Sequence, residues 1–148
     1  MLKKIDFIMT EIIYNLIAIL LFVIVTVIFY NVILRYAFSS GIPWSTELAR
    51  ILFVWMVFLG AIIGLKENGH VKVSMLENKF SEKQREILFV FQNIVIFLIS
   101  ILFLIGSWQQ VLVNISKTTP ALEVSSAYFY IPGLISSIGM GLVAVKFI

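Results

Sequence analysis

Long apolar runs alternate with short polar links along the chain, and this pattern predicts its helices. Four runs contain no charged residue, at 12–34, 51–65, 87–116 and 124–145. An α-helix needs about 20 residues, at about 1.5 Å each, to cross the hydrocarbon core of a bilayer. Three runs reach that length, and the second reaches it if its helix begins near Pro43. We therefore expect transmembrane helices over about 10–36, 43–66, 82–114 and 124–146.

Local signals refine the ends of these helices. For the second helix, either Ser45 is the N-cap or Pro43 is itself the first helical residue. Ser81, followed three residues later by Gln84, has the capping-box pattern that opens the third helix. In the fourth helix, Pro132 donates no backbone hydrogen bond and frees the carbonyl oxygen four residues earlier. Residues 1–148 are thus predicted to form a single all-α, four-helix transmembrane domain.

Composition supports a membrane location and narrows the chemistry. Hydrophobic residues make up 61% of the chain and charged residues 13%, whereas soluble domains have about 45–50% and 25%. The chain has no cysteine, which excludes disulfides, thiolate metal sites and cysteine nucleophiles. The net charge of +3 is explained by orientation and by contact with anionic lipids, so nucleic acid is not an expected partner.

The distribution of basic residues predicts the orientation. Eight Lys and Arg residues lie near the termini and in the link between the second and third helices, against three in the other two links. Because basic links stay on the cytoplasmic side, both termini are predicted to be cytoplasmic. A short amphipathic segment between the second and third helices is expected to lie on the lipid headgroups.

The middle of each predicted span carries no group for chemistry of its own. A transporter that works alone normally has ionisable residues or broken helices near the midplane, and no Asp, Glu, Lys, Arg or His lies there. An independent small transporter or channel therefore stays an alternative only. His70 is the one histidine, and no triad partner or second metal ligand accompanies it. We predict neither an enzyme nor a cofactor or metal site in this chain.

Polar residues gather instead at the outer ends of the first two helices. Arg35 ends the first span, and Glu47 and Arg50 lie three residues apart near the beginning of the second. Two interpretations stay open, namely a clamp between the helices through an Arg35–Glu47 pair, or a docking surface for a partner. We assign six residues to an interface between helices or with a partner: Arg35, Tyr36, Trp44, Glu47, Arg50 and His70.

Small residues spaced four apart predict faces for close helix packing. The second helix carries Gly60 and Gly64, and the fourth carries Gly133, Ser137 and Gly141. Each face fits a helix of this chain or of another. The second helix also has large apolar residues at helical spacing, which predict packing or lipid contact: Trp44, Leu48, Ile51, Trp55, Phe58 and Ile62.

A series of motifs resembles one family of membrane proteins. The motifs are NVILRY at 31–36, PWSTELAR at 43–50, WMVFLG at 55–60, KENGH at 66–70 and TTPALEVSSAYFYIPG at 118–133. In this order they are similar to the small membrane subunit, or Q component, of tripartite ATP-independent periplasmic (TRAP) transporters. Many members carry an acidic pair after the Trp, whereas this chain has Thr46 followed by Glu47.

The resemblance implies a function that composition and spacing do not supply. Such subunits pair with a large membrane subunit, the M component, which holds the substrate and sodium sites and moves as an elevator. A periplasmic binding protein delivers an organic acid, of the C4-dicarboxylate or sialic acid class. We therefore expect a non-catalytic scaffold in the bacterial inner membrane that stabilises the large subunit and helps to dock the binding protein. Sodium is expected in the large subunit.

Overall fold

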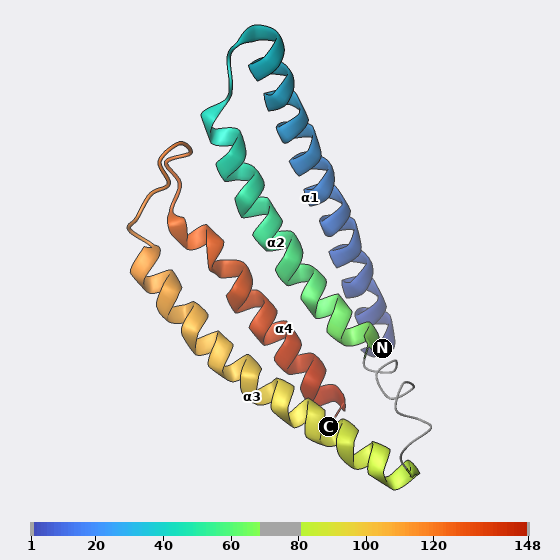
Figure 1. Cartoon of the computed structure of the whole chain (residues 1–148). Coiled ribbons are helices and arrows are strands. Elements are labelled where there is room, and N and C mark those ends of the chain that lie inside the picture. The colour runs from blue at the N-terminus through green and yellow to red at the C-terminus, as the bar shows by residue number, and fades with distance from the viewer. Residues whose placement is uncertain (1, 69–80, 148) are drawn as a thin grey trace.

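The computed structural model describes residues 2–68 and 81–147, most of which are helical (Figure 1). The elements are α1 (Leu2–Phe38), α2 (Pro43–Asn68), α3 (Glu82–Asn114), the 3₁₀ helix η2 (Ser126–Phe129) and α4 (Ile131–Phe147). Four stretches of the described residues are long and apolar enough to cross a membrane: Phe7–Phe38, Pro43–Glu67, Lys83–Asn114 and Ser126–Lys146. The predicted all-α class with four transmembrane helices is confirmed.

The helices lie side by side in the order α1, α2, α4, α3 (Figure 1). Over the described residues, α1 packs against α2 alone, and α4 is the only transmembrane helix that packs against α3. The links 39–42 and 115–125 lie together at one end, called the outer end from here on, and both chain termini lie at the opposite end (Figure 1). The protein is therefore an open row of helices with two broad faces.

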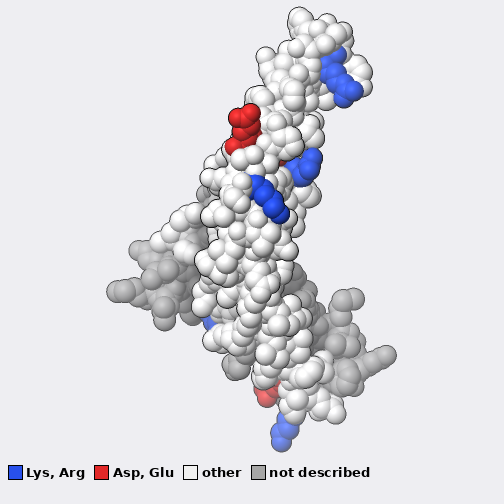
Figure 2. All heavy atoms as spheres, turned by 90° about the vertical axis from the view of Figure 1, so that its left-hand side faces the viewer, with Lys and Arg blue, Asp and Glu red and all other residues white. Residues whose placement is uncertain are grey.

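The middle of the row is free of charge on the face that Figure 2 shows. Charged side chains appear toward its two ends, and an uncharged zone separates them (Figure 2). The uncharged zone matches the four runs without Asp, Glu, Lys or Arg at 12–34, 51–65, 87–116 and 124–145. This separation suits a molecule whose middle lies in hydrocarbon, where a charge costs several kcal/mol.

Pro43 is the first residue of α2, which decides between the two predicted starts of this helix. Ser45 is not the N-cap, because it lies within the helix and its Oγ donates to the Ile42 carbonyl at 2.7 Å. A proline suits the first helical position, where an N–H has no helical partner. Asn31 secures the preceding link by accepting the Ile42 N–H on its Oδ1 at 2.7 Å.

The predicted start of the third helix is confirmed, and that of the fourth is wrong. α3 begins at Glu82, and the Ser81 N–H donates to Gln84 Oε1 at 3.0 Å, as in a capping box. α4 begins only at Ile131, after η2. The predicted amphipathic segment and His70 lie outside the described residues.

Polar bonds hold α1 near both of its ends, to the link 39–42 at one end and to α2 at the other. At the outer end the bond is the one from Ile42 to Asn31. At the opposite end, Lys66 Nζ donates to Thr10 Oγ1 at 2.5 Å, and the Tyr14 hydroxyl bonds to Glu67 Oε1. Polar bonds between helices supply specificity in lipid, where apolar contact alone distinguishes little between a helix and its solvent.

α4 packs closely against α2 at a glycine. A Cβ at Gly139 would lie 2.8 Å from Ile62 Cδ1 and 3.1 Å from its Cγ1. The Ser136 hydroxyl, which is 1% exposed, donates to the Phe58 carbonyl at 3.0 Å. The small-residue face predicted for this helix consists of residues 133, 137 and 141, spaced four apart. Gly139 lies between two of these positions on another side of the helix, so the prediction did not include it.

That predicted face of α4 lies toward α3. A Cβ at Gly133 would lie 2.8 Å from Ser107 Oγ, and one at Gly141 would lie 3.7 Å from Ser100 Cβ. Ser137 is 2% exposed. On α2, a Cβ at Gly60 or Gly64 would meet nothing within 4 Å among the described residues, so no described helix packs closely on these two glycines.

Gly139→Ala should destabilise the protein by about 1–3 kcal/mol, because the added methyl group overpacks against Ile62. Gly60→Ala is the matched control, since its methyl group enters open space and alanine favours a helix by up to about 1 kcal/mol. Unfolding in mixed detergent micelles, followed by circular dichroism, measures both. Equal stability of the two variants would contradict the close contact between α4 and α2.

Candidate interaction surface at the outer end

Residues 115–125 form a compact hairpin between α3 and η2, called the outer hairpin. The Thr119 N–H donates to the Val124 carbonyl at 2.8 Å, and the Ser126 N–H donates to the Lys117 carbonyl at 2.7 Å. Glu123 takes a left-handed backbone conformation, with φ of 57°, which turns the chain back. These bonds give the link a definite shape at the outer end.

Glu47 ties the beginning of α2 to the outer hairpin. Its Oε2 accepts the Leu122 N–H at 2.9 Å, and both carboxylate oxygens accept the Ala121 N–H, at 3.1 and 3.2 Å. The Thr119 hydroxyl lies beside the same carboxylate, and the charge of Arg50 lies near enough to favour it. Hydrogen bonds to an ionised acceptor are about twice as strong as neutral ones. We call this contact the Glu47 latch.

The predicted ion pair between Arg35 and Glu47 is wrong. No such pair joins the two side chains in the described structure, and the Glu47 carboxylate bonds to the outer hairpin instead. α1 and α4 lie on opposite sides of α2 (Figure 1), so a side chain aimed at the hairpin turns away from Arg35. Arg35 lines a separate cleft of about 520 Å³ together with Ser39 and Thr46.

Trp55 makes a second bond from α2 to the segment that precedes α4. Its Nε1 donates to the Tyr128 carbonyl at 3.1 Å. Tyr128 is the residue four before Pro132, whose ring nitrogen has no hydrogen to donate. The indole thus satisfies this carbonyl, which lies in η2. Pro132 is the second residue of α4 and does not lie inside the helix as the sequence predicted, so it interrupts no helical hydrogen bond.

The other residues assigned to an interface stand open at the outer end. Tyr36 is 83% exposed and Trp44 is 41% exposed, and Arg35 and Arg50 are also exposed. The structure thus places them on the surface of the outer end rather than between helices. In the described ranges, no three His, Asp or Glu side chains could together hold a metal ion.

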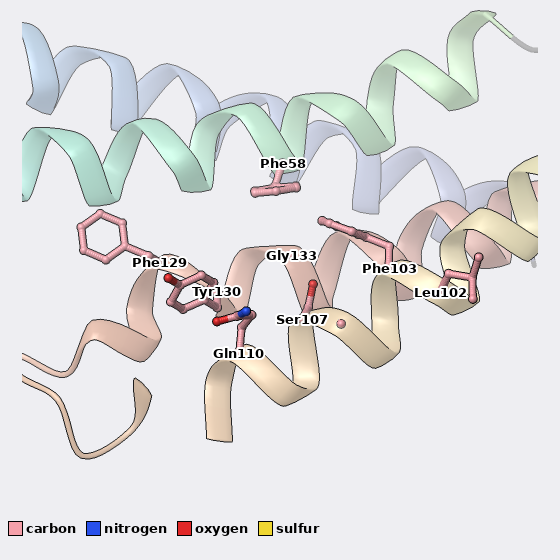
Figure 3. Close-up of a pocket in the computed structure, with 9 residues that line it drawn as sticks. Phe58, Leu102, Phe103, Ser107, Gln110, Phe129, Tyr130 and Gly133 are labelled. Atoms are coloured by element: carbon pink, nitrogen blue, oxygen red, sulfur yellow. The ribbon is translucent and has the colours of Figure 1, made fainter. Parts of the chain in front are cut away.

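A cavity of about 490 Å³ lies in the outer half of the row and was not predicted from sequence (Figure 3). Phe58 of α2 and Phe103 of α3 stack there with ring centroids 5.6 Å apart. Ser107 and Gln110 of α3 and Gly133 of α4 add polar and small groups to its wall. In the sequence, only the two small residues at 106–107 hint at this cavity. They leave space beside Gly133 only when α3 and α4 are packed together, so the sequence alone does not reveal it.

Comparisons with known proteins give one consistent result. The family model for the DctQ component of tripartite ATP-independent periplasmic transporters matches residues 24–148. A TRAP transporter small permease protein of Haemophilus influenzae is 35% identical over 111 residues, which cover 75% of this chain and 69% of that protein. The C4-dicarboxylate TRAP transporter small permease protein DctQ of Vibrio cholerae is 38% identical over 81 residues, or 55% of this chain and 35% of that protein.

A longer relative is also similar to this chain over part of its length. The isethionate TRAP transporter permease protein DctMQ of Oleidesulfovibrio alaskensis is 25% identical over 117 residues. The match covers 73% of this chain but 17% of that protein. Most of the DctMQ chain therefore lies outside the stretch that is similar to this protein.

Glu47→Gln should open the Glu47 latch, because the amide offers one neutral acceptor and turns an NH₂ group toward the same N–H groups. We expect the Ala121 and Leu122 amides to exchange with deuterium on the order of ten- to a hundredfold faster, the effect of losing a charged hydrogen bond. Glu123→Gln removes the same charge from the exposed turn and is the control. Equal exchange rates in the two variants would rule out the latch.

Trp55→Phe should lower the free energy of unfolding by about 1 kcal/mol beyond the loss of ring area, since the Tyr128 carbonyl loses its donor. Trp44→Phe, at an exposed position of the same helix, is the matched control. Unfolding in mixed micelles measures both variants. If Trp44→Phe costs as much as Trp55→Phe, the indole bond does not stabilise the fold.

Proposed function

Since this chain belongs to the DctQ component family of tripartite ATP-independent periplasmic transporters, we propose that it is the scaffold subunit of a sodium-coupled importer of organic acids. The family is one of transporter permease subunits, so the chain is a multi-pass membrane protein and not an enzyme. We assign it to the bacterial inner membrane, with the outer end toward the periplasm and both termini in the cytoplasm.

The open, uncharged row carries this proposal. Its spans hold no ionisable side chain in their middle portions, whereas coupling of sodium to an organic anion requires polar groups near the midplane. α1 and α3 lie at the two edges of the row, and within the described chain each packs against another transmembrane helix on one side only. A subunit of this shape supplies surface rather than a transport path, and the sodium and substrate sites belong to a large partner.

The proposed partner is the M component, along one edge or face of the row. The DctMQ relative supports this partner by its name, and because only 17% of its length matches this chain. A small subunit of this kind would then work beside a much larger one. Long apolar faces suit an obligate membrane contact, since apolar helices distinguish a partner from lipid mainly by shape and by polar bonds.

The outer end is the proposed support for the periplasmic binding protein. The Glu47 latch holds the outer hairpin against α2, so both move as one unit. Arg35, Trp44 and Arg50 are exposed at the same end of the molecule, and exposed aromatic and arginine side chains are favoured at protein interfaces. The proposed cargo is an organic acid of the C4-dicarboxylate or sialic acid class.

Proteoliposomes test the proposal directly. Sodium-dependent uptake of a C4-dicarboxylate or of sialic acid is measured with this chain alone, with a candidate large subunit alone, and with both plus the binding protein. We expect uptake only when both membrane subunits are present. Uptake by this chain alone would establish the alternative, an independent small transporter, and overturn the scaffold role.

Glu47→Gln should lower uptake by the full system up to about tenfold, because a loosened latch reduces the fraction of complexes with a correctly shaped outer end. Glu123→Gln is the control for the change of charge. Co-purification with the large subunit is measured in parallel, which separates weaker subunit assembly from weaker docking. Wild-type uptake together with wild-type assembly in Glu47→Gln would remove the latch from the mechanism.

A further inference from the structure

The cavity between α2, α3 and α4 is not needed for the scaffold role. Its volume of about 490 Å³ lies within the range of about 300–1,000 Å³ that is usual for small-molecule sites. None of the described residues that line it is charged, and the aromatic rings of Phe58, Phe103 and Tyr130 form much of its wall (Figure 3). A mostly apolar cavity with a few polar groups is typical of a ligand site.

Ser107 is the polar group that points to a ligand. Its side chain is 7% exposed, and Figure 3 shows it directed from α3 toward Gly133 at the cavity wall. Two buried serines elsewhere donate within their own helices, Ser100 to Ile96 and Ser137 to Leu134, both at 2.8 Å. The Ser107 hydroxyl has no hydrogen-bond partner in the described structure. A hydroxyl that lies at a cavity wall and has no protein acceptor can donate to a ligand that offers one.

The depth of the cavity in the membrane indicates the kind of ligand. The uncharged run of α3 begins at residue 87, and Ser107 lies about 30 Å farther along the helix at 1.5 Å per residue. Because α3 is inclined to the other helices (Figure 1), this length is the greatest depth that can separate the two residues. Trp108 is 54% exposed and suits the interfacial level. We therefore place its neighbour Ser107 near that level and Phe103, one helical turn farther in, among the acyl chains.

A polar ladder leads from the cavity to a positive charge. Asn114 Nδ2 donates to Gln110 Oε1 at 3.2 Å, and Lys117 Nζ donates to Asn114 Oδ1 at 3.2 Å. Asn114, which the ammonium group contacts, lies four residues or about 6 Å beyond Gln110 along α3. The ammonium group thus lies outside the ester level, where the phosphate of a phospholipid lies.

We propose that this cavity binds one diacyl phospholipid with an anionic headgroup. One acyl chain lies against Phe58 and Phe103, an ester carbonyl accepts the Ser107 hydroxyl, and the headgroup faces Lys117. The acyl chain then meets apolar rings, the ester meets a hydroxyl group, and the phosphate meets a cation. This is the order in which these parts of a lipid follow one another from the hydrocarbon core to the water. This site does not depend on the proposed transport role.

Native mass spectrometry of the full-length chain, titrated with dioleoylphosphatidylglycerol, tests the site. Gly106 lines the cavity, and a Cβ there meets nothing within 4 Å, so Gly106→Leu should fill the space and weaken binding of one lipid at least about tenfold. Gly60→Leu is the matched control, because Gly60 also has open space and lies outside the cavity. Equal lipid binding by these two variants would overturn the proposal.

Two further variants test the polar contacts. Ser107→Ala should weaken binding about two- to tenfold, the effect of one hydrogen bond, while Ser100→Ala, whose hydroxyl serves its own helix, should not. Lys117→Gln should reduce the preference for phosphatidylglycerol over phosphatidylcholine and leave phosphatidylcholine binding unchanged. The lipid should also stay bound when the large subunit is added. If the large subunit displaces the lipid, the cavity binds a side chain of that subunit and the proposal is overturned.

Discussion

The seam between α2 and α4 holds the two halves of this protein together, because no other pair of transmembrane helices joins the α1–α2 pair to the α3–α4 pair in the described structure. In lipid, apolar side chains gain little by leaving one apolar surroundings for another, so close approach and polar bonds must supply the association. The seam has both. Gly139 on Ile62 and Ser136 to Phe58 join α4 to α2 directly, while Trp55 to Tyr128 of η2 and Glu47 to the outer hairpin join α2 to the segment that precedes α4.

These four contacts are spread along the length of the seam, which gives the open row its definite form. A row held by a single line of contacts leaves both broad faces and both edges available for lipid or protein. That form suits the proposed scaffold role. The uncharged middle of every span fits the same role, since nothing there has to pair with an ion during transport.

The seam and the cavity share residues, so that the fold and the proposed lipid site are linked. The Phe58 carbonyl accepts the Ser136 hydroxyl, and the Phe58 ring stacks on Phe103 at the cavity wall. Gly133 brings α4 close to Ser107 and borders the same space. A lipid in this position would fill a gap that three helices of fixed shape cannot close with their own side chains.

Sequence alone determined the four spans, the start at Ser81 and the family, because these follow from local rules and ordered motifs. For the second helix it left two starts open, and the structure chose Pro43. Tertiary structure decided the order α1, α2, α4, α3, the role of Gly139 and the cavity. The spans are apolar nearly all round, so their pattern does not say which side meets which helix. The Glu47 latch was equally hidden, since its partners are backbone N–H groups 74 and 75 residues away, and every residue except proline carries such a group.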